Sequence, residues 1–203
     1  MILCDNQGDV VHGDRLLGLF ALHAKRQGKL SNDTLVATVQ SNYGLERSLN
    51  NQDVSLVRSE VGDYHVAELM RKLGANLGAE SSGHIISSDH LTSGDGLLSF
   101  LLASQAMLET DFPLSVLAEE IDLVPCIEND YPILEKTSLV SLPELLEIVA
   151  REEQHLGKEG RVLLRYSGTE LKIRLLVEAL DSKQAEAVFR ILENALRKAL
   201  KFA

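Results

Sequence analysis

Short apolar runs alternate with amphipathic helical stretches along the first half of this chain, and this alternation restricts the fold more than any other feature. The runs "TLVATVQ" and "VSLVRS" are rich in β-branched and aliphatic residues, as buried strands are. The stretches "RLLGLFALHAKR" and "YHVAELMRKLG" repeat apolar residues at helical spacing, and Gly74 ends the second. Strands that alternate with helices predict an α/β domain of three layers with a mostly parallel sheet. We assign it to residues 11–111.

The pattern changes after a proline-containing linker near residues 111–113. The stretch "LVPCIENDYPIL" reads as extended and "SLPELLEIVAREEQHLG" as a helix, and two strands then flank the turn "RYSGTE". A last helix starts beside Asp181 or Ser182, and either side chain suits an N-cap. This order predicts a smaller α+β domain over residues 112–203, with an antiparallel sheet and helices on one face.

Composition excludes several classes of function. The net charge is −10 and the pI about 5.1, whereas nucleic acids and anionic membranes usually bind a basic surface. Apolar runs such as "LLSFLLASQAML" are too short and too polar to span a bilayer, and the first residues do not form a secretory signal. Cys4 and Cys126 are the only cysteines, which indicates a reducing, cytoplasmic setting.

The turn "RYSGTE" is the strongest candidate for chemistry in the second domain. Its glycine would permit unusual backbone geometry or close approach to a ligand, and its hydroxyl groups are hydrogen-bond donors. Two arginines add planar, permanently charged donors that suit a phosphate. The residues concerned are Arg165, Ser167, Gly168, Thr169 and Arg174. The alternative is an ordinary hairpin turn with solvated charges.

The stretch "GAESSGH" gathers a carboxylate, two hydroxyls and an imidazole around two glycines in the first domain. A carboxylate and a nearby hydroxyl match the vicinal hydroxyls of a sugar, so Glu80 and Ser82 are candidates. His84 could transfer protons near neutral pH. The alternative is a solvated turn carboxylate beside a packed strand histidine.

Three polar junctions lead from strands into helices, in "SNYGLE", "SEVGDYH" and "TSGDG". Asp63 could cap its helix, and Asp95 could be a first-turn acid that favours the helix dipole. Such junctions suit ligand binding beyond the carboxyl ends of parallel strands. We find no Ser-His-Asp set, no glycine-rich nucleotide loop and no metal cluster in the sequence.

Together, "GAESSGH", "TSGDG" and "RVLLRYSGTELKIRLLVE" resemble the third and fourth domains of the α-D-phosphohexomutase superfamily, in the same order and spacing. The "SGTE" loop and the following "IR..VE" are most similar to the phosphoglucosamine mutase branch. This resemblance implies interconversion of glucosamine 6-phosphate and glucosamine 1-phosphate through a bisphosphorylated sugar, for amino-sugar and cell-wall precursor synthesis. It also implies a phosphoserine in the first domain of the full-length enzyme and Mg²⁺ in the second.

By the same resemblance, Glu80, Ser82 and His84 would contact the sugar, with His84 and Asp63 as acid/base candidates. The distal, non-reacting phosphate would be gripped by Arg165, Ser167, Gly168, Thr169 and Arg174. The bisphosphorylated sugar must turn over and bind again with its phosphates exchanged. A site that grips either phosphate makes both orientations productive.

Some positions depart from the family pattern. Tyr64 and His65 stand where the family usually has arginine and tyrosine, so the contacts of that loop are carried over for Asp63 alone. Leu171 replaces a common proline, and Ser81 an asparagine or glutamine. We expect sugar binding to tolerate the change at Ser81.

No stretch of the chain resembles the serine nucleophile segment or the metal loop of the family. Residues 1–10 resemble the sequence that follows the metal loop, and we interpret them as a remnant strand of a missing second domain. The expected protein is therefore the carboxyl-terminal half of a mutase, inactive alone, with a strand edge that could form a homodimer. The alternatives are a stand-alone sugar-phosphate-binding module, or half of a phosphomannomutase or phosphoglucomutase.

Overall fold

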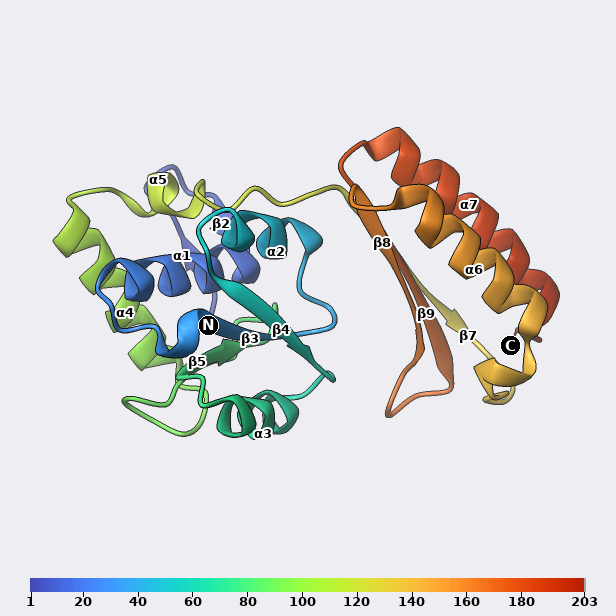
Figure 1. Ribbon diagram of the computed structural model, residues 1–203, viewed down its shortest axis with the longest axis horizontal. Coiled ribbons are helices and arrows are strands. Elements are labelled where there is room, and N and C mark those ends of the chain that lie inside the picture. The colour runs from blue at the N-terminus through green and yellow to red at the C-terminus, as the bar shows by residue number, and fades with distance from the viewer. Residues whose placement is uncertain (203) are drawn as a thin grey trace. The chain divides into compact units, whose positions relative to one another are not determined.

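The computed structural model describes residues 1–202 and divides into two compact units, residues 1–123 and residues 124 onward (Figure 1). The boundary between the units comes later in the chain than the linker expected at 111–113. The reason is that the short helix α5 (Leu114–Ala118) packs on the first unit. Its Leu114 and Leu117 are buried in the same cluster as Leu16 of α1 (Gly13–Arg26). Proline at 113 therefore begins a helix of the first unit and not the second domain.

Residues 1–11 form a small hairpin in the first unit. Strand β1 (Leu3–Cys4) pairs in antiparallel fashion with β2 (Val10–Val11). The terminal amine of Met1 donates a hydrogen bond of 2.9 Å to the carbonyl of Gly83. The strand that we interpreted as a remnant thus has a partner within the chain, in the two-residue strand β2.

The main sheet of the first unit has the strand order β4-β3-β5-β6. Strand β3 pairs in parallel with both β4 and β5, and only β6 runs antiparallel, so the prediction of a mostly parallel sheet is confirmed. The strands are β3 (Thr34–Thr38), β4 (Ser55–Ser59), β5 (Leu77–Ala79) and β6 (Ile85–Ser87).

Helices cover both faces of this sheet and give it three layers (Figure 1). Leu35 and Ala37 of β3 pack in one apolar cluster with α1, α2, α4 and α5. Val36, between them, points to the other face and packs with Val66 and Met70 of α3. The elements not yet bounded are α2 (Tyr43–Asn50), α3 (Asp63–Leu73), α4 (Gly96–Thr110) and the 3₁₀ turn η1 (Ser31–Asp33).

The second unit is an antiparallel sheet of order β7-β9-β8 with both long helices on one face (Figure 1). Its core joins Ile173, Leu175 and Val177 of the central strand to the apolar side of α7. Asp181 caps α7 by accepting from the amides of Lys183 and Gln184, as the sequence predicts. The elements are β7 (Cys126–Pro132), η2 (Leu139–Ser141), α6 (Pro143–Leu156), β8 (Gly160–Tyr166), β9 (Lys172–Ala179) and α7 (Ser182–Ala199).

No helix within residues 1–202 is both long enough and apolar enough to cross a membrane.

Gly13, the first residue of α1, lies against the backbone of the turn between β5 and β6. A Cβ atom at this position would lie 2.0 Å from the carbonyl oxygen of Ser81. Because both contacting groups are backbone, the helix and the turn can approach this closely only without a side chain. The start of α1 thereby fixes the position of the "GAESSGH" turn.

We predict that Gly13→Ala lowers the free energy of unfolding by roughly 1–3 kcal/mol, since the added carbon must displace backbone. Urea denaturation followed by circular dichroism measures the change. Gly168→Ala is the matched control, because a Cβ atom there meets no atom within 4 Å. Its effect should stay within about 0.5 kcal/mol. Equal stability of Gly13→Ala and the unsubstituted protein would contradict the prediction.

Candidate functional site

Two of the three predicted junctions, "SNYGLE" and "SEVGDYH", follow the parallel strands β3 and β4, whereas "TSGDG" comes after the antiparallel strand β6. After β3, Asn42 caps α2 by accepting a 2.8 Å hydrogen bond from the amide of Gly44. Arg58 of β4 donates to the carbonyl of Ser41 at 2.7 Å and pairs with Glu46 at 3.0 Å. These bonds hold the first junction rigidly at the edge of the sheet where β4 and β5 also end.

Glu80, directly after β5, is the residue that joins two of the junctions. Its Oε1 accepts a 2.9 Å hydrogen bond from the amide of Gly62, in the turn between β4 and α3. Its side chain is only 17% exposed, so the carboxylate is held with little freedom. A fixed carboxylate with a second oxygen at the edge of a sheet can accept hydrogen bonds from sugar hydroxyls.

Ser82 and His84 lie beside this carboxylate. His84 Nδ1 is 3.1 Å from the hydroxyl oxygen of Ser82 and 3.8 Å from Oε2 of Glu80. The imidazole is 62% exposed, so the packed strand histidine that we considered as an alternative is not seen. The structure therefore brings all three proposed sugar-contacting side chains into one cluster with an accessible imidazole.

Asp63 is the first residue of α3 and does not cap it. The N-cap is Gly62, whose φ of 125° favours glycine, and the Asp63 carboxylate accepts a 2.8 Å bond from the next amide, that of Tyr64. Asp63 is exposed, and the Gly62–Glu80 bond places its loop beside the cluster. Asp95 instead is the N-cap of α4, accepting from Leu98 at 2.7 Å, and not a first-turn acid.

The two family departures in this loop contact each other. The rings of Tyr64 and His65 pack edge to face with centroids 5.6 Å apart, and Tyr64 is 66% exposed. His65 also lies 3.8 Å from the carboxylate of Glu60. This junction therefore exposes an aromatic surface in place of an arginine.

In the second unit, the strands flanking "RYSGTE" place the two arginines side by side. Arg165 of β8 lies directly opposite Arg174 of β9. Burial lowers the pKa of the Arg165 guanidinium, and the charge of Arg174 lowers it further, while Glu128 and Asp130 act in the opposite direction. Two like charges opposite one another are unfavourable without an anion, so the pair is suited to binding one.

The loop between these strands is held by Ser167. The amide of Ser167 donates to the carbonyl of Lys172 at 2.9 Å, and its hydroxyl accepts from the amide of Glu170 at 3.3 Å. Ser167 is 5% exposed, whereas Gly168 and Thr169 at the tip are exposed. The structure thus brings all five proposed clamp residues to one end of the β8–β9 hairpin.

The backbone argument for Gly168 is wrong. Its φ is not positive, and a Cβ atom would meet nothing within 4 Å, so the fold alone does not require glycine there. The reason that remains is close approach of a ligand to the backbone of the loop.

Sequence reasoning missed the carboxylates that accompany the arginines. Asp130 of β7 lies opposite Arg174 and 3.4 Å from its Nε, and Glu128 lies 3.8 Å from its Nη1. Lys172 pairs with Asp130 and with Glu170, both at 2.7 Å, and these bonds raise the pKa of its ammonium. No local motif marks these acids, because β7 reaches β9 only through the pairing of the sheet.

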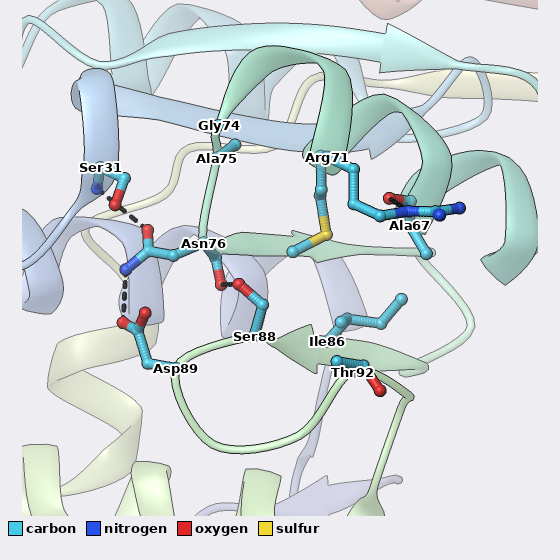
Figure 2. Close-up of a pocket in the computed structure, with 11 residues that line it drawn as sticks. Ser31, Ala67, Arg71, Gly74, Ala75, Asn76, Ile86, Ser88, Asp89 and Thr92 are labelled. Atoms are coloured by element: carbon cyan, nitrogen blue, oxygen red, sulfur yellow. Dashed lines mark hydrogen bonds between the residues drawn. The ribbon is translucent and has the colours of Figure 1, made fainter.

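A pocket of about 640 Å³ in the first unit lies away from all of these residues (Figure 2). It lies between α3 and β6, and one wall comes from Asn76 just before β5, at the opposite end of that strand from Glu80. Asn76 bonds with the amide of Ser31 at 2.9 Å and with Asp89 at 2.5 Å. The polar groups of Asn76, Ser31 and Asp89 in this pocket therefore already bond with one another.

Within residues 1–202, no three His, Cys, Asp or Glu side chains are grouped to hold a metal ion.

Residues 12–123 match alpha/beta/alpha domain III of the phosphoglucomutase/phosphomannomutase family, and residues 130–195 match its C-terminal domain. The chain belongs to this family. It is 44% identical over 200 residues to a phosphoglucosamine mutase of Anaeromyxobacter sp. (strain Fw109-5), covering 98% of this chain and 43% of that protein. It is 42% identical over 201 residues to a phosphoglucosamine mutase of Nitratidesulfovibrio vulgaris, covering 99% and 45%.

The fold also agrees with a solved structure. Aspergillus fumigatus N-acetylphosphoglucosamine mutase, crystallised with GlcNAc-6P and magnesium, matches with a TM-score of 0.78 at 18% identity. The match covers 98% of this chain and 46% of that one. The chain thus spans less than half the length of these relatives, and it matches the domains that follow the first two.

We predict that Glu80→Ala speeds hydrogen exchange of the Gly62 amide by about ten- to a hundredfold, because the amide loses its charged acceptor. Exchange followed by NMR measures the rate. Glu80→Gln is the control, since its carbonyl can still accept the bond. An unchanged rate in Glu80→Ala would show that this bond does not order the turn.

Proposed function

We propose that this chain is the carboxyl-terminal half of a phosphoglucosamine mutase, which interconverts glucosamine 6-phosphate and glucosamine 1-phosphate through a bisphosphorylated sugar. The single observation that carries the proposal is the pair Arg165 and Arg174, opposed on neighbouring strands beneath the "SGTE" loop. The names of relatives more than 40% identical over nearly the whole chain support the amino-sugar substrate.

The second unit grips the phosphate that is not reacting. The two guanidinium groups offer several charge-assisted hydrogen bonds to a dianion, and the exposed loop tip adds the hydroxyl of Thr169 and the open backbone at Gly168. A bound phosphate relieves the repulsion between the arginines. Because the grip does not depend on which phosphate enters, the bisphosphate can bind in either orientation.

The first unit recognises the sugar. Glu80, already held by the Gly62 amide, accepts from sugar hydroxyls, and Ser82 adds a neutral partner. His84 is accessible and hydrogen-bonded, so its imidazole can exchange a proton with a sugar hydroxyl. The exposed Asp63 carboxylate is the second acid/base candidate.

Phosphoryl transfer needs groups beyond these 203 residues. In the proposed enzyme, a phosphoserine and a Mg²⁺ site belong to the two preceding domains, and magnesium supplies charge stabilisation at the transferring phosphoryl group. The residues described here do not form a metal cluster, so we assign no step of the metal chemistry to them. The sugar bisphosphate is the intermediate. We place the enzyme in the cytoplasm, as a homodimer that binds neither nucleic acid nor membranes.

A chimera tests the proposal. Residues 1–203 would replace the matching carboxyl-terminal part of the Anaeromyxobacter relative, to which they are 44% identical. We expect the chimera to convert glucosamine 6-phosphate to glucosamine 1-phosphate, and the chain alone to show no turnover. A folded but inactive chimera would contradict the proposal and favour a non-catalytic binding module. Higher activity with mannose or glucose phosphates would reassign the substrate.

In the same chimera, Arg165→Met should lower kcat/KM by about a hundredfold or more, because the distal phosphate loses a charge-assisted contact. The control is Arg190→Met, which removes an exposed arginine on α7 that pairs only weakly with Glu186. Unchanged kinetics in Arg165→Met would remove the arginine pair from the site.

A further inference from the structure

The segment after β7 lies alongside the clamp loop, although some thirty residues separate them in sequence. The amide of Ile133 donates to the carbonyl of Leu171 at 3.0 Å. The phenol of Tyr166 donates to the carbonyl of Thr137 at 2.5 Å. Between these two bonds, the ammonium of Lys136 donates to the carbonyl of Ser167 at 2.6 Å. Three bonds therefore hold Lys136 against the loop that we propose binds phosphate.

Lys136 differs from the other cations near the loop in its charged neighbours. Lys172 is shared between Asp130 and Glu170, and Arg174 lies within reach of Asp130. Lys136 makes no ion pair with any carboxylate in the described part of the chain, residues 1–202. An ammonium has three donors, and the Ser167 carbonyl takes one of them.

The bond to Ser167 also changes the loop itself. A carbonyl oxygen beside an anion site carries partial negative charge and repels the anion. An ammonium 2.6 Å from the Ser167 oxygen offsets that charge and keeps its own positive charge at the loop. A lysine in this position supports anion binding through both effects.

We propose that Lys136 is a third cation of the phosphate clamp, which binds the distal phosphate together with Arg165 and Arg174. The proposal rests on the proposed function of the clamp and adds a residue from outside the "RYSGTE" motif. Neither the motif nor the spacing along the chain identifies it.

Binding of glucosamine 6-phosphate to the 203-residue chain tests the role, by NMR titration at pH 8. Lys136→Met should weaken binding about tenfold, as the loss of one charge-assisted contact does. Lys136→Arg should recover most of the affinity. Tyr166→Phe is the structural comparison, because it removes one of the three bonds that hold the segment without changing the charge, and its affinity should fall less than that of Lys136→Met.

A second readout separates contact with the anion from a structural role. The phosphate ester carries close to two charges at pH 8 and close to one at pH 5, since its second pKa is about 6. The ratio of dissociation constants between Lys136→Met and the unsubstituted chain should therefore fall at pH 5. A structural bond would give the same ratio at both values.

Each result decides the question. Suppose that Lys136→Met binds as tightly as the unsubstituted chain and that Arg165→Met does not bind. This result overturns the role of Lys136 and leaves the clamp intact. Equal losses in Lys136→Met and Tyr166→Phe at both pH values also overturn it. The last outcome concerns the whole clamp. If glucosamine 6-phosphate in roughly tenfold excess or more does not change the amide chemical shifts of Ser167 to Thr169, both the clamp and the role of Lys136 are contradicted.

Discussion

The parallel pairing of β3 with both of its neighbours is the constraint on which the first unit depends. Leu35, Val36 and Ala37 are fully buried, because consecutive side chains of a central strand point to opposite faces and both faces must be covered. Helices therefore pack on each side, and the crossovers return every parallel strand in the same direction. The turns that carry Gly62 and Glu80 then meet at one edge of the sheet, where a single hydrogen bond joins them.

The second unit depends on strand register instead. Antiparallel pairing sets Arg165 opposite Arg174, an arrangement that costs stability through repulsion and burial. Strand β7 lies on the other side of β9 and places Asp130 beside Arg174, which offsets part of that cost. The opposed arginines are the feature of this unit on which the proposed phosphate grip depends.

Much of the fold could be predicted from the sequence, because periodicity, caps and turns are local. Gly74 does end α3 in the left-handed conformation, and Asp181 does cap α7. The boundary expected at 111–113 was wrong because α5 packs on the first unit, and two other predictions failed on backbone detail within a turn. Asp63 lies one residue inside its helix, and Gly168 has no conformational need to be glycine. Sequence identifies a turn from its residue types, but the φ and ψ angles within it depend on what packs around it.

The sequence by itself determined the order of strands and helices, the two-part organisation, the family and the residue types of the candidate site. Those features follow from patterns a few residues long or from motifs read directly. Only the tertiary structure decided that Glu80 is fixed by Gly62, that β7 brings carboxylates to the arginines, and that Lys136 contacts the clamp loop. These contacts join segments far apart in the chain. Their geometry follows from sheet pairing and packing, which no local pattern of residues encodes.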